Sequence, residues 1–171
     1  MQRVRQLIRD VPNFPEPGIM FRDITPVLED GQAFAQVIDT LAQRYVGQHL
    51  TKIVGIESRG FIFAAALAYR LGCGLVIVRK PGKLPRPTRS IAYALEYGEG
   101  TLHVHDDAVG PSDHVVLVDD LIATGGTAAA AAKLLQECGA KVSEVAAVIE
   151  LTALKGREVL APLPVHALVT Y

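Results

Sequence analysis

The hydrophobic positions of the chain fall into two alternating patterns, continuous runs and spaced repeats. The continuous runs are apolar at nearly every position and rich in β-branched residues. They lie at 52–56, 75–78, 115–118, 142–149 and 165–169. Runs of this length, bounded by polar or turn-forming residues, are typical of strands buried on both faces of a parallel sheet.

The spaced repeats lie between these runs and predict helices. Apolar residues recur at intervals of three and four over 33–45 and 61–68, and an alanine-rich segment runs from Ala128 to Gly139. This β-α-β alternation predicts an α/β fold with an open, mainly parallel sheet flanked by helices. Since a chain of 171 residues fits one domain, we expect residues 1–171 to form a single unit.

The N-terminal segment follows neither pattern for long. Apolar residues from Val4 to Val11 recur at helical spacing and predict a short amphipathic helix. Prolines and a glycine between positions 12 and 18 end that helix and predict an irregular connection. We interpret the next segment, 19–28, as a surface turn with a salt bridge between its arginine and its aspartate.

Three polar loops follow predicted strands, at Glu57–Gly60, Arg79–Arg89 and Asp119–Thr127. The carboxyl ends of parallel strands meet at one edge of a sheet, and ligands of open α/β sheets bind beyond that edge. We therefore expect the three loops to form one binding site.

The third loop joins an acidic pair to a small, hydroxyl-bearing sequence. Asp119 and Asp120 end the predicted strand, and Ala123–Thr127 reads Ala-Thr-Gly-Gly-Thr directly before the alanine-rich helix. Free backbone N–H groups and the positive helix end attract an anion, and carboxylates accept hydrogen bonds from sugar hydroxyls. The loop therefore predicts a site for a phosphate and a sugar, although it matches neither the P-loop nor the dinucleotide glycine motif.

The other two loops supply positive charge. Arg59 stands where a strand meets a helix start, a position that suits an anion, while Ser58 is also a candidate helix N-cap. Arg79–Arg89 holds five basic residues and no acidic one, with three prolines and a glycine that keep it irregular. A solvated surface loop is one interpretation, but its place at a strand end favours a lid that closes over a polyanion.

A turn-like Gly-Glu-Gly at 98–100 joins two segments that alternate loosely, 91–98 and 101–105, and these predict a hairpin. His103 and His105 share one face of the second strand. A metal site with the aspartates that follow is an alternative, but a solvent-facing strand edge fits the alternation better.

Composition narrows the class of protein. Half of the residues are hydrophobic and a fifth are charged, with a net charge of -1. This balance gives no reason to expect nucleic-acid or membrane binding. The two cysteines, Cys73 and Cys138, lack metal-ligand spacing and predict buried thiols in a reducing cytoplasm. The first ten residues hold no apolar core of signal-peptide length.

The segment 116–127, with its apolar run, double acid and Thr-Gly-Gly-Thr, resembles the phosphoribosyl-diphosphate signature of the type I phosphoribosyltransferases. Further segments, in order along nearly the whole chain, resemble the adenine branch of that family. They are 21–26, 55–60, 79–80, 82–85, 95–98, 150–152 and 154–157. The resemblance implies the type I phosphoribosyltransferase fold, with a small N-terminal hood over about residues 1–30 and a flexible basic loop.

The resemblance also implies an enzyme of purine salvage that joins adenine to 5-phosphoribosyl 1-diphosphate, giving AMP and diphosphate. Asp119 and Asp120 would hold the ribose hydroxyls. The loop residues Ala123, Thr124, Gly125, Gly126 and Thr127 would hold the 5-phosphate. The diphosphate would contact Glu57, Ser58, Arg59, Arg79, Lys80 and Lys83, with the Glu57–Ser58 peptide in the cis form.

In the same way, Met20, Phe21 and Arg22 would form the adenine pocket, with Phe21 stacking on the base and backbone atoms at 20 and 22 reading its edge. Glu96 would be catalytic, by stabilising the cation-like ribose carbon or by exchanging a proton with the purine. Mg²⁺ would be held mainly by the substrate's oxygens, so we expect no metal ligand set on the protein. A symmetric homodimer in the cytoplasm would let some basic residues act in the partner's site.

Besides a nucleotide-binding α/β domain without transfer chemistry, two other functions remain open from the sequence. A phosphoribosyltransferase for another purine is one, although the segment around Phe21 argues against it. A non-catalytic nucleotide-sensing regulator on the same fold is the other, although this near-neutral chain shows no added nucleic-acid-binding segment.

Overall fold

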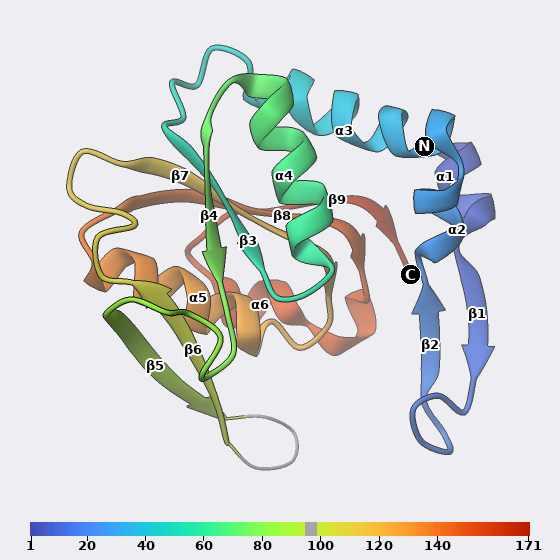
Figure 1. Cartoon of the computed structure of the whole chain (residues 1–171). Helices are drawn as coiled ribbons and strands as arrows, with labels where there is room; N and C mark the ends of the chain where they lie inside the picture. The colour runs from blue at the N-terminus through green and yellow to red at the C-terminus, as the bar shows by residue number, and fades with distance from the viewer. Residues whose placement is uncertain (95–98) are drawn as a thin grey trace.

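A computed structural model describes residues 1–94 and 99–171. Its centre is a sheet of five parallel strands in the order β4-β3-β7-β8-β9 (Figure 1). These strands are β3 (Lys52–Ile56), β4 (Gly74–Val78), β7 (His114–Ile122), β8 (Lys141–Glu150) and β9 (Val165–Thr170). The prediction of an open, mainly parallel sheet is confirmed, and each of the five apolar runs lies in one of its strands.

Helices cover both faces of this sheet. One face carries α3 (Gly31–Tyr45) and α4 (Gly60–Leu71), and the other carries α5 (Gly126–Glu137) and α6 (Gly156–Leu160). Neighbouring residues of β7 alternate between the two cores, since Val116 and Val118 pack with α3 and α4 while Val115 and Leu117 pack with α5. Burial on both sides is the physical reason why the strand is apolar at every position.

The backbone of strand β3 at Gly55 lies directly against helix α4. A Cβ atom on Gly55 would come within 2.8 Å of the Ala64 Cβ and 3.2 Å of the Gly60 carbonyl oxygen. The glycine therefore lets α4 lie directly against the sheet, and this close contact sets where the helix begins, directly after Arg59.

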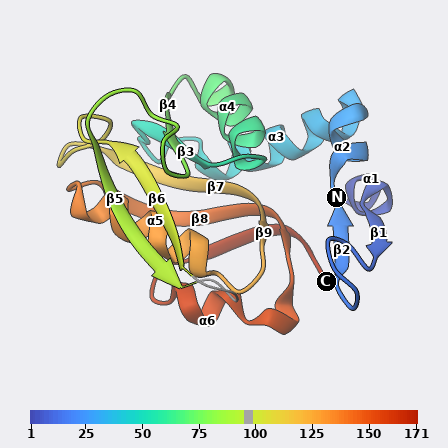
Figure 2. The same ribbon diagram turned by 60° about the horizontal axis from the view of Figure 1, so that its bottom comes forward.

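A two-stranded antiparallel hairpin, β5 (Thr88–Ala94) with β6 (Glu99–His105), covers part of the second face (Figure 2). Leu102 and Val104 of β6 are buried in the same core as α5. The expected hairpin is confirmed, but its first strand begins at Thr88. The irregular part of the basic segment is therefore shorter than predicted.

The N-terminal segment differs most from the sequence-based expectation. The helix α1 (Gln2–Leu7) ends before Ile8, which is extended, and Val11 lies in β1 (Arg9–Pro12) rather than in a helix. β1 pairs with β2 (Met20–Asp23), and α2 (Thr25–Glu29) follows at once. The predicted turn at 19–28 is therefore wrong, because hairpin pairing between β1 and β2 supplies the backbone hydrogen bonds.

The predicted salt bridge within this segment also differs. Arg22 pairs with Asp10 of the opposite strand, not with its neighbour Asp23. Asp23 instead accepts hydrogen bonds from the backbone and the hydroxyl of Thr25, at the start of α2. After β8 the chain forms a short 3₁₀ turn, η1 (Thr152–Leu154). Among the described residues, no helix is long and apolar enough to cross a membrane.

Candidate active site

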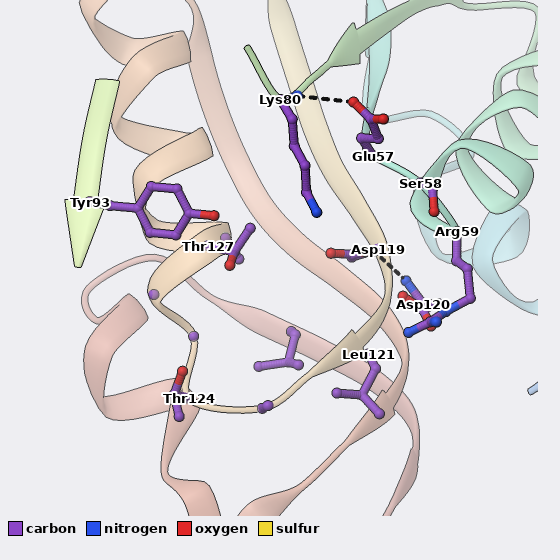
Figure 3. Close-up of a pocket in the computed structure, with 15 residues that line it drawn as sticks. Glu57, Ser58, Arg59, Lys80, Tyr93, Asp119, Asp120, Leu121, Thr124 and Thr127 are labelled. Carbon is purple, nitrogen blue, oxygen red and sulfur yellow. Dashed lines mark hydrogen bonds and ion pairs between the residues drawn. The ribbon is translucent and has the colours of Figure 1, made fainter. Parts of the chain in front are cut away.

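The three polar loops meet at one cavity of about 470 Å³ beyond the carboxyl ends of β3, β4 and β7 (Figure 3). The residues that line it come from the β3–α4 loop, the end of β4, the hairpin and the β7–α5 loop. They are Glu57, Ser58, Arg59, Lys80, Tyr93, Asp119, Asp120, Leu121, Ile122, Ala123, Thr124, Gly125, Gly126, Thr127 and Ala128. Bringing these loops together is what the strand order predicts.

The loop between β7 and α5 is shaped by two glycines in contact. Gly125 has φ +82°, and a Cβ atom there would come within 2.6 Å of the Gly156 carbonyl oxygen. A Cβ atom on Gly156 would in turn meet the Ala123 carbonyl oxygen at 2.5 Å. The loop therefore rests on the start of α6 and presents its N–H groups, at the start of α5, to the cavity.

The acidic pair has two different environments. Asp119 is half-buried and accepts a hydrogen bond of 2.8 Å from the backbone of Asp120, whose own side chain is 9 % exposed. Burial, followed by the charge of Asp120, raises the pKa of Asp119 well above its ordinary value. Gly60 makes room for the carboxylate, since a Cβ atom there would lie 2.8 Å from it.

Arg59 forms an ion pair with Asp120. Its guanidinium carbon also lies 5.4 Å from the centre of the Phe21 ring, on the N-terminal hairpin. One side chain therefore contacts both the end of the sheet and the hood, and Figure 3 shows its guanidinium beside Asp120. The cation–π contact and the ion pair both hold the guanidinium in place at the edge of the cavity.

Glu57 organises the basic segment. Its carboxylate accepts a hydrogen bond of 2.9 Å from the backbone of Lys80 and forms an ion pair with Arg79 at 3.2 Å. Burial opposes ionisation of Glu57, but these two partners outweigh it and lower the pKa of the carboxyl. Arg79 also donates to the backbone carbonyl of Lys83.

The cationic side chains of this segment do not all reach the cavity. Lys80 points into it, whereas Arg79 and Lys83 are not among the residues that line it (Figure 3). Glu57 lines the cavity, but its carboxylate is turned toward Arg79 and Lys80. The Glu57–Ser58 peptide is cis, as the resemblance implies.

A second cavity of about 390 Å³ lies beneath the hood and is mostly apolar. Phe14 and Phe21 form an edge-to-face pair there, with ring centres 5.1 Å apart. The residues that line it are Val11, Phe14, Phe21, Asp23, Ile24, Thr25 and Arg59. Arg59 therefore lines both cavities, so the two cavities adjoin at this side chain.

Of the three residues expected around a base, the second cavity includes Phe21 only. Met20 is 47 % exposed, and the Arg22 guanidinium lies over the ring of Tyr171. Neighbouring residues of a strand point to opposite sides, so only every second side chain of β2 can face the cavity.

Several residues that line the two cavities are not predicted as site residues from the sequence. The sequence predicts Val11 in a helix and Phe14 in an irregular connection. In the structure β1 pairs with β2, which sets Val11 opposite Phe21 and brings these side chains to the second cavity. Tyr93 carries no chemical signal that marks a site in sequence, whereas Leu121 and Ile122 lie within the predicted loop Asp119–Thr127. The proposed catalytic Glu96 lies outside the described residues, so its role stays a prediction.

The part of the chain that the structure describes has no cluster of three His, Cys, Asp or Glu side chains that could hold a metal ion. His103 instead lies beside the hydroxyl of Thr88, with its ring nitrogen 3.1 Å from the oxygen. A five-stranded parallel sheet that carries an acidic pair and a glycine-threonine loop at its carboxyl edge is typical of the phosphoribosyltransferases. A family model described as phosphoribosyl transferase domain matches residues 27–160.

Closer relatives narrow the assignment. The chain is 58 % identical over 165 residues to an adenine phosphoribosyltransferase of Roseiflexus sp. (strain RS-1), covering 96 % of each chain. It is 55 % identical over 170 residues to that of Chloroflexus aurantiacus, covering 99 % of this chain and 98 % of the relative. The crystal structure of the enzyme from Thermoanaerobacter pseudethanolicus superposes with a TM-score of 0.96, at 48 % identity and 99 % coverage of both chains. The chain belongs to the adenine phosphoribosyltransferase family.

Proposed function

We propose that the larger cavity binds 5-phosphoribosyl 1-diphosphate, that the apolar cavity binds adenine, and that the site joins them to give AMP and diphosphate. A bond forms between a ring nitrogen of the purine and the ribose carbon, and the bond from that carbon to the diphosphate oxygen breaks. The observation that carries this proposal is Arg59, which lines both cavities and so marks where base and sugar meet.

The larger cavity suits the phosphoribosyl half of the substrate. The N–H groups of Ala123–Thr127 and the start of α5 would hold the 5-phosphate. Asp119 and Asp120 would accept hydrogen bonds from the ribose hydroxyls. Because Asp120 is paired with Arg59, ribose binding would free the guanidinium for the negatively charged diphosphate.

The leaving diphosphate gains charge as its bond breaks, so cations must lie near it. Lys80 and Arg59 are the basic side chains that line the cavity. Glu57 would act by holding the basic segment through Arg79 and the Lys80 backbone, while the Ser58 peptide would lie against the diphosphate.

Mg²⁺ would arrive with the substrate, bound mainly to its oxygens. When bound there, the ion neutralises part of the charge that develops on the diphosphate. The carboxylates of Asp119 and Asp120 line the cavity and would suit a doubly charged cation nearby, since burial and the neighbouring charge of Asp120 raise the pKa of Asp119.

The base would stack on Phe21 between the walls of the apolar cavity. Backbone atoms at Met20 and Arg22 would read its edge. A yeast adenine phosphoribosyltransferase, 39 % identical with a TM-score of 0.92, was crystallised with adenine and an imino-altritol bisphosphate, and each chain is covered by at least 97 %. That complex supports a two-part site of this kind.

Glu96 would stabilise the cation-like ribose carbon or exchange a proton with the purine. We expect Glu96→Gln to slow turnover far more than it weakens substrate binding. Steady-state kinetics with both substrates measures the split between kcat and KM, and unchanged turnover would remove Glu96 from the mechanism.

We also propose a homodimer in which Arg79 and Lys83 serve the partner's site. Exposed apolar side chains lie on the surface that α4 and the edge strand β4 form: Tyr69 of α4 is 90 % exposed, and Leu75 of β4 is 44 % exposed. Sedimentation velocity should give twice the mass of one chain. Tyr69→Glu should shift the mass to that of one chain and lower diphosphate affinity, and a wild-type monomer would overturn the proposal.

The reaction would take place in the cytoplasm, where a reducing environment suits the two free thiols of Cys73 and Cys138. We expect diphosphate release with adenine and little with guanine or hypoxanthine in one coupled assay. Release with another purine instead would favour the alternative base specificity. No release with any base, together with a shifted band in a nucleic-acid gel-shift assay, would favour the regulator.

A further inference from the structure

The base pocket is built on a hairpin whose far side is held by a tyrosine from the other end of the chain. Tyr171 follows β9, and in Figures 1 and 2 the C-terminus lies beside β2. The Arg22 guanidinium carbon lies 4.1 Å from the centre of the Tyr171 ring, and that of Arg5 on α1 lies 4.9 Å from it. Two arginines of the hood therefore stack on one aromatic ring.

The backbone of Tyr171 is itself firmly attached. Its N–H donates to the Glu150 carbonyl at 2.9 Å, and its carbonyl accepts from the backbone and the hydroxyl of Thr152 at 2.8 and 2.7 Å. The intervening residue, Leu151, donates to the Ile122 carbonyl at the start of the phosphate loop. The ring is thus fixed to the same frame that shapes the larger cavity.

Arg22 transmits this attachment to the base pocket. It lies directly after Phe21 on β2, and it pairs with Asp10 across the hairpin. Stacking on Tyr171 therefore limits the rotation of β2, and with it the place of the Phe21 ring opposite Arg59. Cation–π contacts of this kind strengthen when they are partly desolvated, and the Arg22 side chain is only 20 % exposed.

We infer that Tyr171 is a positioning residue for the purine: by stacking on Arg22 it fixes Phe21 against the phosphoribosyl cavity and so sets the affinity for the base. This inference rests on the proposed function, because it assigns the apolar cavity to the purine. Tyr171 touches neither cavity. Its effect should therefore fall on one substrate only.

The test replaces the ring while keeping apolar bulk. Tyr171→Leu should raise the KM for adenine about 10-fold, which corresponds to about 1.4 kcal/mol, and leave the KM for 5-phosphoribosyl 1-diphosphate within twofold. Tyr171→Phe keeps the aromatic face and should restore the adenine KM to within twofold of the wild type. Both are measured by initial rates with each substrate varied in turn.

The matched control is Arg3→Met. Arg3 lies on the same N-terminal helix as Arg5 and pairs with Asp30, away from Tyr171 and from the base pocket. We expect its adenine KM to stay within twofold. An unchanged adenine KM in Tyr171→Leu, an equal rise for both substrates, or an equal rise in Arg3→Met would each overturn the inference. Absence of AMP from the wild-type protein would instead overturn the proposed function.

Discussion

The two neighbouring aspartates of the site differ in how strongly their surroundings stabilise the ionised carboxylate. Asp120 has a cationic partner in Arg59, whereas burial and then the nearby charge of Asp120 oppose the ionisation of Asp119 and raise its pKa. A folded-state pKa above the unfolded one means that the group's contribution to stability is present below the unfolded pKa, near 3.9, and is lost as the pH rises through the folded pKa. Asp119 therefore costs stability at neutral pH.

We expect Asp119→Asn to raise the melting temperature at pH 7.5 and to leave it nearly unchanged at pH 4. Each 1 kcal/mol corresponds to about 2–4 °C for a chain somewhat smaller than 200 residues. The same variant should lose at least 10-fold in affinity for 5-phosphoribosyl 1-diphosphate, since the amide is a weaker acceptor for ribose hydroxyls. Thermal melts and calorimetric titration measure the two effects.

Asp107→Asn is the control for this prediction, because Asp107 pairs with Arg86 at an exposed surface site. It should change stability by no more than about 0.5 kcal/mol. A lower melting temperature of Asp119→Asn at pH 7.5 would contradict the view that the ionised Asp119 carboxylate destabilises the fold.

Glu57 is a second residue whose place in the structure defines its role. Its carboxylate binds the basic segment through Arg79 and the Lys80 N–H. We expect Glu57→Gln to weaken diphosphate binding about 10-fold, because a neutral amide cannot form the ion pair that holds this segment. Direct titration with diphosphate measures it, with Glu158→Gln as the exposed control; equal affinities in the three proteins would disprove the role.

At the scale of elements, the β7–α5 loop and α6 are packed as one unit. We expect Gly125→Ala to destabilise the fold by about 1–2 kcal/mol through its left-handed backbone and to raise the KM for 5-phosphoribosyl 1-diphosphate more than 10-fold. The second effect follows because the new Cβ atom would push the loop away from Gly156.

Gly47 provides a matched comparison. It has φ +78°, but a Cβ atom there would meet nothing within 4 Å. Gly47→Ala should therefore cost the backbone strain alone, which is less stability in urea unfolding than Gly125→Ala costs, and leave the KM unchanged. If both variants had the same KM, the contact between the phosphate loop and α6 would have no part in binding.

Some elements of the fold could be predicted from the sequence and others could not. Strand β7 was predictable because Val115–Val118 is buried on both faces and is therefore apolar throughout. Strand β1 was not, since its four residues are mostly exposed and pair with β2 across a loop. The spacing of apolar residues from Val4 to Val11 does not distinguish one helix over the whole segment from a short helix followed by a strand.

The site divides in the same way. The Asp119–Thr127 loop was predictable from chemistry, because acids, glycines and hydroxyls stand together in the sequence. The apolar cavity was not, because Val11 and Phe14 become neighbours of Phe21 only once β1 pairs with β2, and the sequence does not predict that hairpin. The ion pair of Glu57 with Arg79 joins the ends of two different strands, so no local sequence pattern predicts it.

At the scale of the whole molecule, polar interactions far from the cavity carry part of the stability. Glu144 of β8 is 6 % exposed and binds the Arg44 guanidinium at 2.6 and 2.7 Å and the Tyr45 hydroxyl at 2.6 Å. Burial opposes its ionisation, but these partners lower its pKa. The stabilisation is therefore present above the unfolded pKa, near 4.3, and is lost as the pH falls through the folded pKa.

We expect Glu144→Gln to cost about 1–3 kcal/mol in the free energy of unfolding at pH 7, and less at pH 4. Because none of these residues lines either cavity, kcat and both KM values should stay within twofold. Urea unfolding at the two pH values, together with initial rates, tests this separation. A loss of activity without a loss of stability would contradict it.

The position of Arg59 between the two cavities also bears on inhibitor design. A flat ring under the hood and an acidic group beyond the sheet would both lie against the same guanidinium, from opposite sides. Joining two such fragments by a short linker makes the second contact intramolecular, at an effective concentration in the millimolar range when the linker fits the span. The linker that passes Arg59 would then decide whether two weak fragments become one strong ligand.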